Sequence, residues 1–260
     1  MDLNSVRLAF EEHGKGTPLV LIHGFPLNRS IWLPLVPFLK NRARLILPDL
    51  RGHGQTPLPE IGISTMRLMA EDIAVLMDQL KIECAIIVGH SMGGYVALSF
   101  AQAYPGRVAG LGLISTQAVE DTPERRLARL KQAEEIKHKG MKVLLPMAEK
   151  LTANPAQVEP LKTMIAANQP NGAMAALKGM ADRPDMLEAL ADFQFPVLVL
   201  AGQADALIPV ERSATMAQML NRGWLVELPE VGHLPMMEAP QKTANSLEEL
   251  IYDSGLVISG

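Results

Sequence analysis

The chain has 260 residues, of which 48% are hydrophobic and 20% charged, and this composition excludes disordered, collagen-like and coiled-coil proteins. Its formal net charge is −4 at pH 7 and it has no long run of lysine or arginine, which argues against nucleic acid or an anionic membrane surface as a partner. The length suits one large α/β domain, and the single cysteine, Cys84, excludes an internal disulfide bond.

The beginning of the chain has charged residues where a signal peptide would have an apolar stretch, namely Glu11, Glu12 and Lys15. Nowhere does the sequence contain a run of about 18 apolar residues. We therefore expect a cytoplasmic protein without membrane contact. The sequence predicts no oligomeric state.

Short apolar runs that end in glycine, proline or aspartate predict strands buried on both faces of a sheet. Segments with helical spacing of apolar residues lie between them, for example after Ser64. Because strand and helix alternate, the sequence predicts an α/β fold with a doubly wound, mostly parallel sheet. The predicted strands are residues 19–22, 45–47, 85–88, 111–114, 197–200 and 224–228.

The alternation stops after Ser115, and residues 121 to about 190 have the pattern of consecutive helices. Such a block, leaving from the carboxyl end of a strand, can cover the crevice in which these sheets bind ligands. We therefore predict a helical cap, residues 118–191, on a core formed by residues 1–117 and 192–260. The predicted breaks between the helices are Gly140, Asn154-Pro155, Gln169-Pro170 and Arg183-Pro184.

The motif Gly89-His90-Ser91-Met92-Gly93 stands between a predicted strand and a predicted helix. A nucleophilic serine needs a strained strand-to-helix turn, and glycine two residues to either side lets the neighbouring backbone approach. A Gly-x-Ser-x-Gly pattern arises by chance in about one chain in ten of this length. The prediction of a nucleophile therefore depends on the strand predicted before the pattern and the helix predicted after it. We predict that Ser91 is a nucleophile; the alternative is a structural glycine turn.

A serine nucleophile needs a general base, which the fold must bring close from elsewhere in the chain. His233 lies in a loop after the last predicted strand, which places it on the same carboxyl-end face as Ser91. The alternative is a histidine that only closes a surface loop. Of the other histidines, His90 adjoins the serine on a tight turn, and His23 and His53 lie beside glycines in loops. His13 lies in a polar edge segment and His138 in the predicted cap.

The base in turn needs a carboxylate that fixes its tautomer and stabilises the imidazolium. Asp205 follows the strand 197–200 and gives the chain order Ser91, Asp205, His233 expected of this arrangement. After the preceding strand the only nearby acid is Glu120. The alternative role for Asp205 is the N-cap of the next helix.

Negative charge that develops on a substrate oxygen needs hydrogen-bond donors already in place. The backbone N–H of Met92 points there from the first turn of its helix, and the N–H of Phe25, after a strand and Gly24, is the predicted second donor of an oxyanion hole. The alternative for the Phe25 loop is simply a turn. We expect no cofactor and no metal ion, because the histidines are scattered and residues 89–94 lack the order of a dinucleotide or triphosphate loop.

These motifs together resemble the α/β-hydrolase superfamily over nearly the whole chain, through residues 23–26, 49–54, 89–94, 202–205 and 232–233. Within it the chain is similar to capped carboxylesterases and oxoadipate enol-lactonases. In these enzymes the turn that carries the nucleophile, called the nucleophile elbow, has a sequence similar to Gly-His-Ser-Met-Gly-Gly. The resemblance implies a cap inserted after the sixth strand. Two departures are Thr56, where the family often has serine, and the absence of the His-Gly-Gly-Pro loop of proline iminopeptidases, which argues against peptidase activity.

A serine rather than an aspartate at the elbow argues against dehalogenases and epoxide hydrolases of this fold and favours acyl chemistry. We expect a carboxylic ester hydrolase, a carboxylesterase or lactonase, that works through an acyl-enzyme on Ser91. A carbon–carbon bond hydrolase, a cofactor-free perhydrolase and a non-catalytic receptor remain alternatives.

The predicted cap is rich in methionine, whose flexible thioethers can line an apolar pocket or merely pack helices together. If they line a pocket, the substrate is a small apolar ester or lactone. Four cap lysines are candidates for binding an acidic substrate, although lysines along helices are usually solvated. The methionines are Met141, Met147, Met164, Met174, Met180 and Met186, and the lysines are Lys142, Lys150, Lys162 and Lys178.

Overall fold

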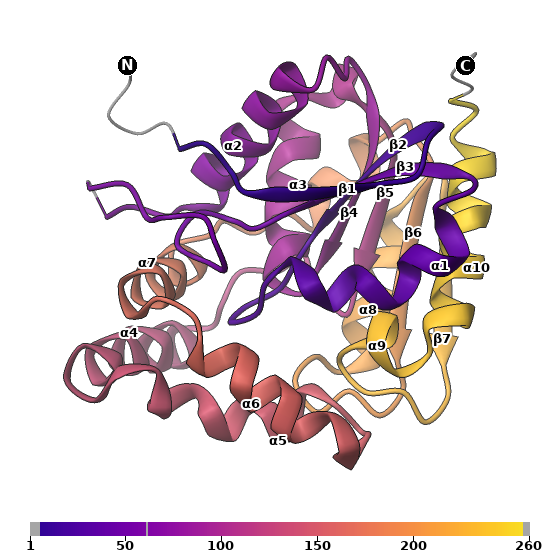
Figure 1. Ribbon diagram of the computed structural model, residues 1–260. Helices are drawn as coiled ribbons and strands as arrows, with labels where there is room; N and C mark the ends of the chain where they lie inside the picture. The colour runs from indigo at the N-terminus through magenta and orange to yellow at the C-terminus, as the bar shows by residue number, and fades with distance from the viewer. Residues whose placement is uncertain (1–5, 61, 257–260) are drawn as a thin grey trace.

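The computed structural model describes residues 6–60 and 62–256, in which seven strands form one sheet of order β1-β3-β2-β4-β5-β6-β7 (Figure 1). β1 pairs antiparallel with β3, and all other neighbours are parallel. The predicted doubly wound, mostly parallel sheet is confirmed. The strands are β1 Phe10–His13, β2 Thr17–Ile22, β3 Ala43–Pro48, β4 Ala85–His90, β5 Val108–Ile114, β6 Val197–Gly202 and β7 Gly223–Leu228.

Each predicted strand lies inside an observed one, because the central strands are continuous apolar runs. Every residue of β2, β4 and β6 is buried, as parallel strands covered on both faces require. β1, Phe-Glu-Glu-His, was not predicted as a strand. It is a partly exposed edge strand with charged residues, and an edge strand of this kind lacks the apolar run that marks a buried one.

Helices cover both faces of the sheet (Figure 1). α1 Val36–Leu39 and α10 Pro240–Asp253 contact each other on one face, and α2 Met66–Gln79 and α3 Met92–Ala103 contact each other on the opposite face. In the described part of the chain, no helix is both long and apolar enough to cross a membrane. The other helices of the predicted core are α8 Val210–Met219 and α9 Pro235–Glu238, with short 3-10 helices η1 Arg29–Leu35 and η2 Pro105–Arg107, and the 3-10 helix η5 Glu188–Asp192 lies at the end of the predicted cap.

A helical segment connects β5 to β6 and lies apart from the sheet (Figure 1). Its helices begin and end at the predicted breaks: α4 is capped by Gly140, which has φ +68°, and Pro155 and Pro170 open the next helices. The elements are α4 Pro123–Lys139, η3 Gly140–Met147, α5 Ala148–Leu151, η4 Pro155–Gln157, α6 Val158–Ala166 and α7 Pro170–Ala181.

The position of this segment corrects one expectation. It follows β5, the fifth strand of the described chain, rather than a sixth strand, because β1 is the only described strand that precedes β2. The division into a core, residues 1–117 and 192–260, and a cap, residues 118–191, stays a prediction.

Candidate active site

Ser91 occupies the turn between β4 and α3 and has φ 52° and ψ −115°, a conformation that L-residues rarely adopt. The two flanking glycines are needed for close backbone contact. A Cβ on Gly89 would lie 2.1 Å from the carbonyl oxygen of Gly93, and one on Gly93 would lie 2.2 Å from that of Ile22. The turn is tied to the next strand, because the N–H of Ser91 donates to the carbonyl of Ile114 at 2.9 Å. The backbone therefore has the strained geometry predicted for the elbow.

Asp205 and His233 come together from the loops that follow β6 and β7. Nδ1 of His233 lies 2.7 Å from Oδ2 of Asp205, and the two side chains are only 1% and 2% exposed. The other carboxylate oxygen, Oδ1, accepts the backbone N–H groups of Leu207 at 2.8 Å and Ile208 at 3.1 Å. Asp205 thus holds the turn before α8 and also contacts the histidine, whereas the N-cap position of α8, the alternative role considered for it, belongs to Pro209.

Ser91 and His233 line the same small cavity, whose volume is about 50 Å³. The buried Nε2 of His233 has no hydrogen-bond partner among the described residues. With Nδ1 bonded to a carboxylate, this nitrogen is the free acceptor of the imidazole. A cavity of this size holds only a few water molecules, so a substrate requires side chains around it to move.

Two backbone N–H groups beside this cavity are without a protein acceptor in the part of the chain that the structure describes. They belong to Phe25, in the loop after β2, and to Met92, the first residue of α3. Helix starts leave such N–H groups free, and the Phe25 loop is closed by a bond from the N–H of Leu27 to the carbonyl of Gly24 at 3.0 Å. These are the two donors predicted for an oxyanion hole.

The loop that carries His233 is held by the carboxylate of Glu238, which sequence reasoning did not single out. Oε2 accepts the N–H groups of Gly232 at 3.0 Å and of Ala153, in the helical segment, at 2.9 Å. Oε1 accepts the N–H of Leu234 at 3.2 Å. One carboxylate therefore fixes the backbone on both sides of the histidine and links it to the end of α5.

The remaining buried histidines support loops. His23 joins the loops after β2 and β3: its Nε2 accepts the N–H of Leu50 at 3.0 Å, so its Nδ1–H donates to the carbonyl of Gly24, also at 3.0 Å. Burial lowers the pKa of His23 to about 4 and that of His53 to about 3, which keeps both rings neutral.

His90, next to the serine, points away from it and contacts the predicted base from behind. Its Nε2 lies 2.8 Å from the carbonyl oxygen of His233 and donates to it, and the two rings meet edge to face at 4.8 Å. Burial holds the pKa of His90 well below its usual value, so this ring is a neutral support. The motif residue Thr56 also has a bracing role, because its hydroxyl donates to the carbonyl of Asp49 at 2.7 Å and accepts the N–H of Ala9 at 2.9 Å.

Two arginines of α4, Arg125 and Arg129, line the cavity of Ser91 and His233, and sequence reasoning missed them. Their spacing of four residues on one helix places them on the same face, and that pattern was the available signal. Of the six cap methionines, two line this cavity, Met147 and Met180. None of the four cap lysines does.

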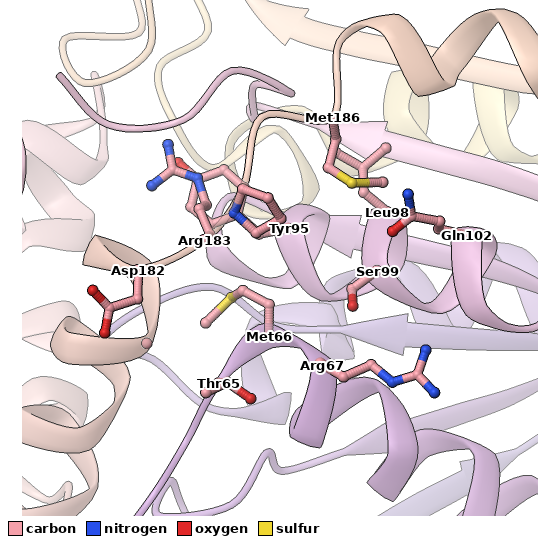
Figure 2. Close-up of a pocket in the computed structure, with 12 residues that line it drawn as sticks. Thr65, Met66, Arg67, Tyr95, Leu98, Ser99, Gln102, Asp182, Arg183 and Met186 are labelled. Carbon is pink, nitrogen blue, oxygen red and sulfur yellow. The ribbon is translucent and has the colours of Figure 1, made fainter.

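A larger cavity of about 390 Å³ lies beside the cavity of Ser91 and His233, and Tyr95 lines both. Figure 2 shows Arg183 next to Tyr95 in this cavity, and the guanidinium carbon stands 4.1 Å from the ring centroid. Ser91 and His233 do not line it, so chemistry at the serine belongs to the smaller cavity. Among the described residues, no group of histidine, cysteine or carboxylate side chains is placed to hold a metal ion.

The chain matches the model of the alpha/beta hydrolase fold family over residues 17–240. It is 37% identical to a solved thermophilic esterase from Thermogutta terrifontis with malate bound, with a TM-score of 0.92 over 96% of this chain and 95% of that one. The enol-lactonase from Burkholderia xenovorans LB400 shares the fold, with 22% identity and a TM-score of 0.87 over 95% of this chain and 97% of that one.

Two curated relatives complete the comparison. The chain is 33% identical over 244 residues to a dihydrolipoyllysine-residue acetyltransferase component of an acetoin cleaving system from Pseudomonas putida; the match covers 90% of this chain but only 63% of that relative's length. It is 28% identical to a pimeloyl-[acyl-carrier protein] methyl ester esterase from Aromatoleum aromaticum, over 90% of this chain and 97% of that one. With the family model matched over most of its length, this chain belongs to the α/β-hydrolase fold family.

Proposed function

We propose that this protein is a serine hydrolase that cleaves carboxylic esters through an acyl-enzyme on Ser91, with His233 as general base and Asp205 as its orienting carboxylate. The observation that carries the proposal is the buried contact of 2.7 Å between Asp205 and His233, which leaves an unpartnered Nε2 at the cavity that Ser91 also lines.

In the proposed reaction Asp205 keeps the His233 proton on Nδ1, so that Nε2 takes the proton of the Ser91 hydroxyl as its oxygen attacks the ester carbonyl. The N–H groups of Phe25 and Met92 stabilise the oxyanion of the tetrahedral intermediate. His233 then gives its proton to the departing alcohol. A water molecule, activated in the same way, releases the acid and regenerates the serine.

The proposed cap has a direct part in this site. Arg125, Met147 and Met180 come from the helical segment and line the cavity of the predicted nucleophile. Since the cavity is small, we propose that the segment of residues 118–191 moves to admit the substrate, and that flexible thioethers at the cavity make this movement easy.

Ester substrates are also supported by the relatives: the solved relative at 37% identity is an esterase, and a curated relative is a methyl ester esterase. An enol-lactonase shares the fold of this chain, and a lactone remains the alternative substrate. A wholly apolar substrate, as expected from the methionines, fits poorly with two arginines at the cavity.

The test is turnover of aryl esters of increasing acyl length by wild type and Ser91→Ala, together with intact mass after reaction with an aryl phosphonate. We expect turnover and a single phosphonate adduct on Ser91, both lost in the variant. An adduct without turnover of any ester would refute the substrate class and favour the carbon–carbon hydrolase or perhydrolase. No adduct would refute the serine mechanism and favour the receptor.

A further inference from the structure

The catalytic cavity borders a cluster of charges that is not balanced. Asp121, just before α4, is paired with three guanidiniums, those of Arg125, Arg129 and Arg183. Although burial raises the pKa of Asp121, the hydrogen bond and the charges of Arg129 and Arg183 outweigh it and lower the pKa below its ordinary value. One negative charge thus faces three positive ones, which leaves a surplus of two positive charges.

The surplus faces the cavity rather than bulk solvent alone. Among the described residues that line the cavity, Arg125 and Arg129 are the charged groups apart from the predicted base, and no carboxylate lines it. Inside a cavity of low polarity an unbalanced positive charge attracts an anion more strongly than at an open surface.

Both arginines keep N–H donors without a strong acceptor. One Nη of Arg129 lies 3.4 Å from the sulfur of Met180, which is a weak acceptor. Its other Nη makes one long hydrogen bond, of 3.4 Å, to Oδ1 of Asp121. Arg125 has only an ion pair of 3.4 Å from its Nε to Asp121, so its Nη groups have no protein acceptor within the described chain.

A purely structural role accounts for two of the arginines but not for the third. Arg129 and Arg183 bind Asp121 closely and so join α4 to the end of α7. Arg125 is 40% exposed and adds only a long ion pair to a carboxylate that is already held twice. Arg126, its neighbour on the helix, turns away from the cavity and is paired with Asp182 at 2.6 Å.

On the basis of the proposed hydrolase function, we propose that the substrate is an ester that carries a carboxylate, such as a monoester of a dicarboxylic acid, and that Arg125 and Arg129 bind that carboxylate. A guanidinium presents parallel N–H donors that match the two oxygens of a carboxylate. The carboxylate would replace the sulfur of Met180 as acceptor, so opening of the cavity and recognition of the anion occur together.

The experiment compares two pairs of esters that differ only in one charge. The first pair is the 4-nitrophenyl monoester of glutaric acid and that of glutaramic acid, which bears an amide in place of the carboxylate. The second pair places the same change on the leaving group, as 4-carboxyphenyl and 4-carbamoylphenyl acetate. Ser91→Ala supplies the blank, which corrects for spontaneous hydrolysis of the glutarate ester.

In at least one pair we expect the wild type to favour the carboxylate ester by about ten-fold or more in kcat/KM, mainly through KM, and to lose this preference as ionic strength rises. Arg125→Gln should reduce the preference by about ten-fold, whereas Arg125→Lys should keep part of it. Arg126→Gln removes the same charge one residue away and outside the cavity, so it should leave the preference unchanged.

The outcomes separate this proposal from the hydrolase function. Equal turnover of charged and neutral esters in both pairs, or an equal effect of Arg125→Gln and Arg126→Gln, overturns carboxylate recognition while the hydrolase stands. If no ester turns over, calorimetric titration of Ser91→Ala with glutarate and with glutaramide decides: binding of glutarate alone, weakened by Arg125→Gln, supports the proposal, and no difference between the two overturns it.

Discussion

Replacing Asp205 by asparagine tests the proposed triad through the tautomer of His233. In the wild type, Oδ1 of Asp205 accepts two backbone N–H groups, those of Leu207 and Ile208, while Oδ2 faces Nδ1 of His233. The single oxygen of an asparagine amide must take the place of Oδ1, because an NH2 group there would meet two N–H donors. The amide NH2 then faces Nδ1 of the histidine.

This arrangement reverses the roles of the imidazole nitrogens. Nδ1 must now accept a hydrogen bond, so the proton resides on Nε2, and the nitrogen that should take the Ser91 proton is already occupied. The same substitution in a serine protease triad costs about 10⁴-fold in kcat, and we expect a loss of that order here. At 1.36 kcal/mol for each factor of ten, this loss is about 5 kcal/mol of transition-state stabilisation.

The assay is kcat for a 4-nitrophenyl ester at pH 7, with the rate of phosphonate labelling as a second readout and thermal melting as a check of folding. Asp185→Asn is the matched control: its Oδ1 likewise accepts an N–H two residues on, that of Leu187 at 2.8 Å, in a turn away from the cavity. The control should keep full activity. A folded Asp205→Asn protein within ten-fold of wild type would refute the reasoning and direct attention to Glu120.

Three further predictions concern the frame of the site. Gly93→Ala places a Cβ 2.2 Å from a backbone oxygen and should lower the free energy of unfolding by about 1–3 kcal/mol or more in urea titration, whereas Gly106→Ala, with no atom within 4 Å, should be neutral. Glu238→Gln sets an NH2 group against backbone donors beside the predicted base, so the thermal midpoint and kcat should both fall; an unchanged kcat would contradict its positioning role. Because the pKa of His23 is about 4 in the folded chain and about 6.5 in the unfolded chain, the unfolded state binds more protons in this range, and His23 should contribute about 2 kcal/mol to the fall in the free energy of unfolding from pH 7 to pH 5, beside the contributions of His53 and His90; His23→Gln should make that fall smaller by this amount.

The sheet and the candidate triad were predictable because parallel strands impose the geometry. Strands buried on both faces appear in the sequence as continuous apolar runs, and their carboxyl ends lie along one edge of the sheet. Asp205 follows one such strand, β6, and His233 follows the neighbouring edge strand β7, so their contact follows from strand order. The strained backbone of Ser91 follows equally from the two glycines beside it.

The parts that escaped prediction depend on contacts between segments that are distant in the sequence. β1 is recognised by its pairing with β3, since its own four residues include two adjacent glutamates and form no apolar run. Glu238 binds three backbone N–H groups that come from two distant parts of the chain. Arg125 reads as an ordinary surface residue of a polar helix until α4 is placed over the cavity.

The difference between these two groups of residues has a physical origin that bears on specificity. The candidate catalytic side chains stand beyond strand ends whose spacing the sheet fixes, whereas the arginines proposed to bind the substrate stand on a helix of the segment between β5 and β6. Asp121 contributes to the position of α4, because it binds both Arg129 of this helix and Arg183 after α7. The same carboxylate sets the charge that the cavity presents, since without it three guanidiniums would be unopposed. The docking of α4 and the preference for an anionic ester are therefore coupled, and a change at this carboxylate alters both, while a change at Arg125 alters the preference alone.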